Sequence, residues 1–156
     1  MIAYLSGGME NAENEGVDWR KMMTEWLKIN LGHDVIDPTL ESRKVMKDNN
    51  AKDFRNWKKT DPIKFKEYFR LLIQQDIDAI IGKADYLIVL WDSSVLKGGG
   101  THGEVTIAHW VNKPIYLVNR LPLEDISSWI FSCSSRMYDS VDHLKNDLLK
   151  IYRSDK

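Results

Sequence analysis

Short apolar runs alternate along this chain with longer segments of helical periodicity, and this alternation limits the folds open to it. The runs lie at residues 2–6, 85–91 and 114–119, and residues 33–37 form a shorter strand pattern. Apolar runs of this length are typical of strands that helices cover on both faces. Strands that alternate with helices favour one parallel sheet. We therefore expect a single-domain, doubly wound α/β fold of Rossmann or flavodoxin-like type across residues 1–156, with about five parallel strands and helices on both faces.

The connecting segments carry apolar residues at helical spacing. Helices are predicted at residues 17–31, 62–81, 102–112 and 140–152. Residues 39–61 are polar and basic, and one or two short helices are expected there. The position of a last short strand stays open between residues 130–133 and residues 137–138.

The composition narrows the setting and the partners. The chain has one cysteine, Cys133, and no apolar run approaches the roughly 20 residues that a bilayer span needs. Its first residues lack the basic and apolar regions of a signal peptide. We therefore expect a cytoplasmic protein without a membrane partner. A net charge of −1 gives no case for binding a nucleic-acid polymer.

The charge is nevertheless unevenly distributed. Residues 43–70 hold ten Lys or Arg and four Asp or Glu, which is an excess of six positive charges. The simpler interpretation is a solvated helical face, because charge runs usually have that role. The alternative is a basic helical insertion, at about residues 39–70, that attracts a phosphate or an acidic partner.

Two acids fall on the apolar faces of their predicted helices. Asp76 lies four residues after Leu72 and four before Ile80, and Glu104 lies four before Ala108. Acids are rarely buried unless they are paired or functional. Burial raises the pKa of a carboxyl group, so that it can act as a nucleophile or as an acid–base group near neutral pH.

Each acid also has a structural alternative. Thr101-x-x-Glu104 fits a capping box, in which the glutamate binds the first amide of its own helix. Asp76 could bind a loop amide, whereas Asp78 falls on the polar side of the same helix. Together, at the ends of neighbouring strands, the two acids favour a functional role. Paired carboxylates suit glycosidic cleavage, where one attacks the anomeric carbon and the other transfers protons.

The order of several short motifs resembles the nucleoside 2-deoxyribosyltransferase superfamily, which includes 2′-deoxynucleoside 5′-phosphate N-hydrolases and related nucleotide N-glycosidases. The resemblance spans roughly residues 2–118. Its motifs are Tyr4-Leu5-Ser6-Gly7-Gly8-Met9, Asp37-Pro38, Asp76 followed by Asp85, Gly100-Thr101-x-x-Glu104 and Lys113-Pro114. The chain departs from the family at Gly98, where many members carry an acidic residue, at the unusual His102-Gly103 pair, and in its longer basic segment at residues 43–70.

This resemblance implies an enzyme that cleaves or transfers the N-glycosidic bond of a nucleoside or nucleoside 5′-monophosphate, without a metal or organic cofactor. Glu104 matches the nucleophile that forms a covalent glycosyl-enzyme. Asp76 matches an aspartate that handles the proton or the sugar hydroxyl, and Tyr4 matches a tyrosine that positions the nucleophile. Asp85 matches an aspartate with a structural role.

Further residues are predicted to contact the substrate. They are Ser6, Gly7, Gly8 and Met9 in the first turn, Gly98, Gly99, Gly100 and Thr101 in the second, and Trp57. Ser6, Gly7 and Gly8 match the family loop that lines the sugar or phosphate, while the second turn presents backbone amides at a helix N-terminus. Trp57 is a candidate for stacking on a base, although a place in the core or at an interface is the favoured interpretation.

Competing functions remain at this stage. His102-x-Glu104 has the form of a zinc-deaminase motif, but that chemistry needs a downstream pair of cysteines, so no metal is expected. The chain could instead be a nucleotide-binding sensor or regulatory module, with Glu104 only capping its helix. The weakest option is a structural protein that docks through its basic segment. A homodimer or higher homo-oligomer is expected.

Overall fold

The sheet of this computed structural model, which describes residues 1–153, contains five parallel strands in the order β2-β1-β3-β4-β5. The strands are β1 (Ile2–Gly7), β2 (Asp34–Ile36), β3 (Tyr86–Trp91), β4 (Ile115–Asn119) and β5 (Arg136–Tyr138). The predicted single-sheet α/β fold is confirmed. After β2 the chain crosses to β3 on the other side of β1, so the order reverses between β1 and β3, where ligands bind in such folds.

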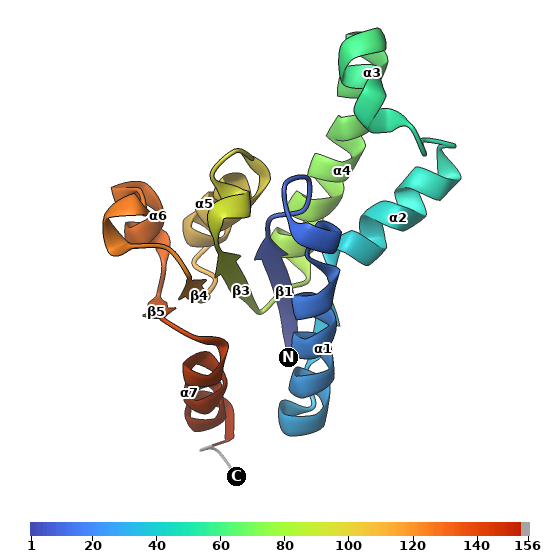
Figure 1. Cartoon of the computed structure of the whole chain (residues 1–156). Coiled ribbons are helices and arrows are strands. Elements are labelled where there is room, and N and C mark those ends of the chain that lie inside the picture. Colours follow the sequence, from blue (N-terminus) through green and yellow to red (C-terminus); the bar gives the residue numbers. More distant parts are fainter. Residues whose placement is uncertain (154–156) are drawn as a thin grey trace.

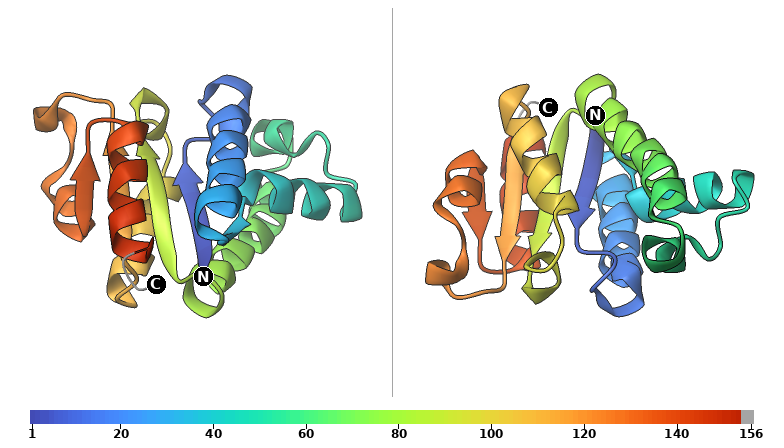
Figure 2. Two further views of the ribbon diagram at one scale, coloured as in Figure 1. Left: turned by 90° about the horizontal axis from the view of Figure 1, so that it is seen from below. Right: turned by 90° about the horizontal axis from the view of Figure 1, so that it is seen from above.

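Helices cover both faces of the sheet, as Figure 2 shows. One face carries α1 (Val17–Leu31) and α7 (Val141–Arg153), and the other carries α4 (Pro62–Gly82), α5 (Gly100–Trp110) and α6 (Ser128–Cys133). Strand side chains alternate between faces. Ile88 and Leu90 therefore pack with α1 and α7, whereas Val89 and Trp91 pack with α4, α5 and α6.

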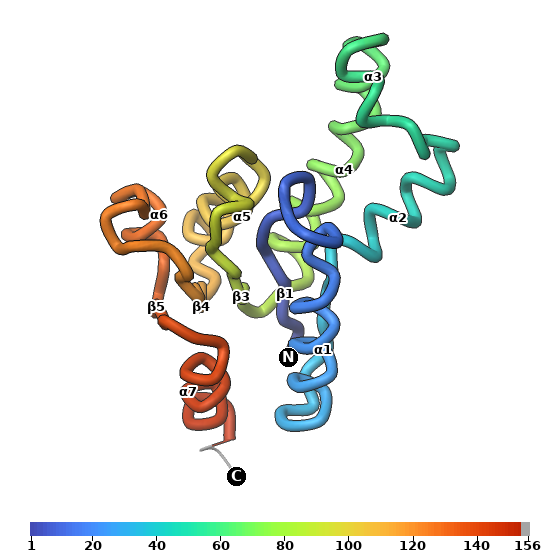
Figure 3. Tube along the Cα trace, in the orientation of Figure 1, coloured from blue at the N-terminus to red at the C-terminus, as the bar shows by residue number. Residues whose placement is uncertain are grey.

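Two short helices extend the fold beyond the edge of the sheet. They are α2 (Pro38–Asp48) and α3 (Phe54–Thr60), and they pack with the first half of α4 around Ala51, Tyr68 and Leu72. We call residues 38–72 the helical projection. Figures 1 and 3 show the chain leaving the sheet through α2, turning at α3 and returning along α4. The basic segment thus folds as two short helices and the start of a third.

Some predicted boundaries need correction. Residues 130–133 lie in α6, and the last strand is β5, so the second of the two positions considered for it was right. The helix predicted at 102–112 begins at Gly100, which places Thr101 inside the helix. Among residues 1–153, no helix is long and apolar enough to cross a membrane.

Candidate active site

The carboxylate of Glu104 is held by two hydroxyl groups from β1. The Tyr4 hydroxyl donates to Oε1 at 2.9 Å, and the Ser6 hydroxyl donates to Oε2. Both side chains point to the α4 and α5 face, because alternate residues of a strand share a face. Tyr4 and Ser6 are fully buried. The strand therefore fixes the direction in which the carboxylate points.

The capping interpretation of Glu104 is wrong. The residue at the N-cap position of α5 is Gly99, and no side chain caps that helix. Thr101 is buried within the first turn instead of preceding it. Because the helix starts two residues earlier than predicted, the Thr101-x-x-Glu104 spacing no longer matches a capping box. Both carboxylate oxygens of Glu104 accept hydrogen bonds from β1.

Asp76, on α4, belongs to the same group of side chains. Burial raises its pKa to about 7, and the negative charge of Glu104 contributes to the rise. The Tyr4 hydroxyl and the Arg20 guanidinium lower the pKa by smaller amounts. Asp78 lies two residues further on the exposed side, where it accepts a hydrogen bond from Gln74. The predicted orientation of both aspartates is confirmed.

Burial also raises the pKa of Glu104, while the hydrogen bonds from Ser6 and Tyr4 and the charge of Arg20 oppose the rise. The pKa of Tyr4 is raised well above its ordinary value, first by burial and then by the two acids. Tyr4 is therefore a protonated donor near neutral pH. Glu104 and Asp76, whose negative charges repel each other, thus lie beside the neutral donor Tyr4. Groups with strongly shifted pKa values of this kind cluster at functional sites.

Arg20, on α1, was not identified from the sequence, and it holds the backbone next to the site. It is fully buried, and its Nε lies 3.8 Å from Oδ1 of Asp37. The guanidinium donates to five backbone carbonyls, those of Leu5, Gly7, Gly8, Glu15 and Gly16. It therefore fixes the loop between β1 and α1. Arg20 lies three residues before Met23 and seven before Leu27 on the buried face of α1, so the argument used for Asp76 and Glu104 would have found it.

The two glycine turns have different structural demands. A Cβ on Gly8 would collide with the Ser94 side chain, and one on Gly7 would lie 3.1 Å from the Trp19 ring. These two positions need glycine because the backbone passes so close to its neighbours. A Cβ on any residue of the second turn, Gly98–Gly100, meets no atom within 4 Å. The second turn therefore faces open space before α5.

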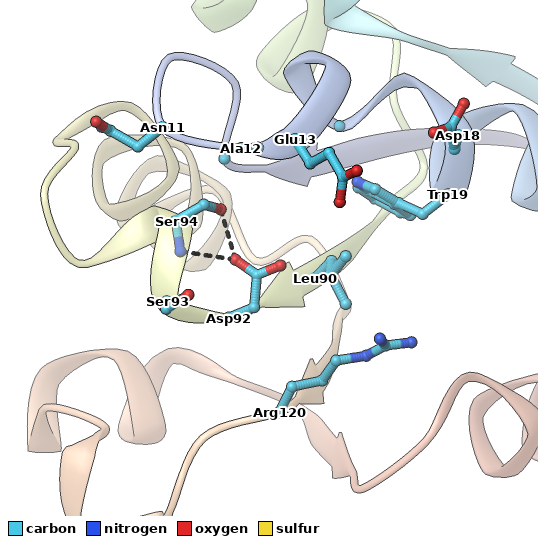
Figure 4. Close-up of a pocket in the computed structure, with 12 residues that line it drawn as sticks. Asn11, Ala12, Glu13, Asp18, Trp19, Leu90, Asp92, Ser93, Ser94 and Arg120 are labelled. Atoms are coloured by element: carbon cyan, nitrogen blue, oxygen red, sulfur yellow. Dashed lines mark hydrogen bonds between the residues drawn. The ribbon is translucent and has the colours of Figure 1, made fainter.

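A cleft of about 430 Å³ opens beside the first turn, on the α1 side of the sheet. It lies between the β1–α1 loop and the segments that follow β3 and β4, as Figure 4 shows. Glu13, Asp18 and Asp92 bring negative charge to its walls, and Arg120 brings positive charge. Gly8 borders the cleft, but Glu104, Asp76 and Tyr4 do not line it.

The remaining predicted residues lie in several places. Met9 follows Gly8 and is partly buried. Trp57 packs edge-on against Tyr68 in the helical projection, with 5.8 Å between ring centroids, and the Lys64 ammonium lies 3.9 Å from its ring. Tyr68 precedes Asp76 by eight residues, or about 12 Å along a helix. Trp57 is thus part of a separate cluster rather than of the group around Glu104.

Two further aspartates of the motifs, Asp85 and Asp37, have structural contacts. Asp85 accepts a hydrogen bond from the Ile2 amide at 2.7 Å, which ties the start of β1 to β3. Asp37 is buried and caps α2 by accepting from the Thr39 amide at 2.8 Å. Within residues 1–153, no group of three or more His, Cys, Asp or Glu side chains is arranged to hold a metal ion.

The resemblance noted from the motifs has no independent support from wider comparison. A scan against models of known protein families finds none that matches the chain, and a search of curated proteins finds no match. The functional argument consequently depends on the geometry around Glu104.

Proposed function

We propose that this protein cleaves or transfers the N-glycosidic bond of a nucleoside or nucleoside 5′-monophosphate, with Glu104 as the nucleophile. The observation that carries the proposal is the double hydrogen bond that Glu104 receives from Tyr4 and Ser6. A glutamate that only stabilised its helix would bind the helix amides. Here its oxygens are oriented by the strand, as a positioned nucleophile requires.

The chemistry follows from two carboxyl groups with different roles. One oxygen of Glu104 attacks the anomeric carbon and forms a C–O bond. The C–N bond to the base breaks, and its electron pair goes to the base nitrogen, which takes up a proton. Water then attacks the same carbon in hydrolysis, or a second base attacks it in transfer. The C–O bond to Glu104 breaks, and the Asp76 carboxylate, which gave up its proton in the first step, takes the proton of the attacking group. This is the double displacement that retaining glycosidases use.

Asp76 fits the role of proton donor. A pKa of about 7 leaves a large share of its carboxyl groups protonated at neutral pH. General acids work best when their pKa lies near the working pH. Tyr4 links the two acids, because its hydroxyl donates to Glu104 and also interacts with Asp76. It keeps the nucleophile oriented while the charge on the pair changes.

A direct assay tests the proposal. The purified chain is incubated with purine and pyrimidine nucleosides and with their 5′-monophosphates, in ribose and 2′-deoxyribose forms. Chromatography then measures the free base, with and without a second base as acceptor. We expect base release from at least one substrate, and base exchange if the enzyme is a transferase. No release and no exchange across the panel would contradict the proposal.

The cleft favours a second candidate, a nucleotide-binding module without catalysis. Its walls do not include Glu104, Asp76 or Tyr4. In such a module the ligand occupies the cleft, and the acids have only structural roles. Calorimetry distinguishes the two candidates: the module binds a nucleotide that stays intact on long incubation, and its affinity is unchanged by Glu104→Gln.

A further inference from the structure

Two arginines of the helical projection converge on one carboxylate of the β1–α1 loop. Nη2 of Arg55, on α3, lies 2.7 Å from Oε1 of Glu15, and Nη2 of Arg43, on α2, lies 3.8 Å from Oε2. The exposed fraction of the side chain is 42% for Arg55, 48% for Arg43 and 43% for Glu15. The two guanidiniums come from different helices and meet at one anionic group, which both could donate to at once.

The backbone that presents this carboxylate has an unusual conformation. Asn14 and Glu15 have φ values of 46° and 54°, and Gly16 follows with 69°. Residues other than glycine rarely adopt this left-handed conformation, because the Cβ lies too close to the following carbonyl oxygen. From inside, Arg20 binds the carbonyls of Glu15 and Gly16. The loop is therefore held from within by Arg20, and the Glu15 side chain is held from outside by the projection.

Exposed ion pairs of this kind are weak. Each contributes little to stability, because water and salt screen the charges. A phosphate monoester carries close to two negative charges and three acceptor oxygens, and arginine binds such groups through paired, charge-assisted hydrogen bonds. A phosphate at this position would therefore interact more strongly with the two guanidiniums than one glutamate does.

We propose that Arg43 and Arg55 form a binding site for the phosphate group of a phosphomonoester, and that the Glu15 carboxylate occupies this site in the free protein. Neighbouring lysines have other contacts: Lys44 pairs with Glu41 at 2.7 Å, and Lys64 lies over the Trp57 ring. Because Glu13 and Gly16 line the cleft, a phosphate that displaces Glu15 also frees the outer side of the loop bordering the cleft.

The test measures phosphate binding without any turnover, so it stands apart from the proposed glycosidic chemistry. Calorimetry with inorganic phosphate at pH 7.5 and constant ionic strength gives the affinity of the unmodified chain. Glu15→Gln removes the competing charge and should tighten binding by about 3–10-fold, as expected when weak exposed ion pairs are lost. Adding Arg55→Gln or Arg43→Gln to that variant should weaken binding at least tenfold.

Lys58→Gln is the matched control, because it removes one positive charge from the same helix and Lys58 makes no contact with Glu15. It should change the affinity by less than twofold. Arg55→Lys keeps the charge but removes the paired donors, and it should weaken binding nearly as much as Arg55→Gln. Equal weakening by Lys58→Gln and Arg55→Gln would show diffuse attraction and overturn the site. Unchanged affinity in Glu15→Gln, with an unchanged thermal melt, would overturn the role of Glu15.

Discussion

The two edges of the sheet bury polar side chains in different ways. At the carboxyl edge, beside the buried donor Tyr4, burial raises the pKa of Glu104 and of Asp76, and the charge of Glu104 raises the pKa of Asp76 further. At the amino edge, His33 and Tyr86 share a hydrogen bond of 2.8 Å between Nδ1 and the hydroxyl. Beside them, the hydroxyls of Tyr116 and Tyr152 lie 3.0 Å apart, and the rings of Tyr86 and Tyr152 are stacked.

The difference separates a neutral polar cluster from one built around two acids. Tyr86 and Tyr152 are neutral near pH 7, because burial raises the pKa of both hydroxyls, and burial lowers the pKa of His33 so that it stays neutral as well. These three side chains therefore carry no charge near pH 7. At the carboxyl edge the charge of Glu104 disfavours ionisation of Asp76. The nearby charge of Arg20 lowers the pKa of both acids and so favours their ionised forms. Strained electrostatics of this kind cluster at functional sites.

The largest expected effect belongs to Glu104→Gln. The amide is nearly the same size, but its single oxygen can replace only one of the two carboxylate oxygens that accept from Tyr4 and Ser6, and it cannot attack an anomeric carbon. We expect base release to fall by at least about 10³-fold, as for the loss of other nucleophiles. Chromatography of the free base measures the rate, and circular dichroism checks the fold. Activity that survives in a folded variant would remove Glu104 from the reaction.

Asp76→Asn should lower turnover by about 10²–10⁴-fold, because a general acid is lost. The matched control is Asp78→Asn on the same helix, at an exposed position, which should change the rate by less than twofold. Since the acid form of Asp76 is needed and its pKa is about 7, activity of the unmodified protein should fall as pH rises past 7. Equal effects of the two substitutions would show that Asp76 has no special role.

Much of this comparison is visible in the sequence. Alternating apolar runs predicted the parallel sheet, and helical phase alone placed Asp76 and Glu104 inward and Asp78 outward. These features depend on local periodicity, which the chain carries everywhere. Arg20 lies on the apolar stripe of α1 with Met23 and Leu27, and the same helical phase predicts that it points inward.

Other features depend on contacts between distant segments. Helix α5 begins at Gly100, two residues before the start that the sequence predicts. The predicted start places Thr101 at the N-cap position and so predicts a capping box with Glu104. The separation of Trp57 from the site follows from the packing of Trp57 on Tyr68 in the helical projection, which no local pattern reveals. Arg43 and Arg55 lie 28 and 40 positions along the chain from Glu15, so no local pattern predicts that they pair with it.

A pair of tyrosine substitutions sharpens the contrast between the edges. Tyr86→Phe removes the partner of His33 and should destabilise the fold by about 1–3 kcal/mol, the usual cost of a buried polar group left unpaired. It should leave turnover unchanged. Tyr4→Phe should lower turnover by about tenfold or more while it costs less stability, because Glu104 keeps its bond from Ser6. Urea unfolding and the base-release assay measure both quantities, and a reversed pattern would contradict the division of roles.

The smallest expected effect is in the pH dependence of stability, where the two edges should have opposite signs. His33 has a lowered pKa in the folded chain, through burial first and then the amino terminus, against the opposing charge of Asp85. The unfolded chain therefore binds more protons, and stability from His33 is lost as pH falls below its unfolded value of 6.5.

Asp76 acts in the other direction. Its pKa rises from 3.8 to about 7 on folding, so its contribution is complete below pH 3.8 and is lost as pH rises to about 7. Urea unfolding between pH 4 and pH 8 tests both signs. Relative to the unmodified protein, Asp76→Asn should gain stability as pH rises, and His33→Gln should gain stability as pH falls below 6.5. Parallel slopes in the two variants would show that the edges do not differ in the charge state they favour.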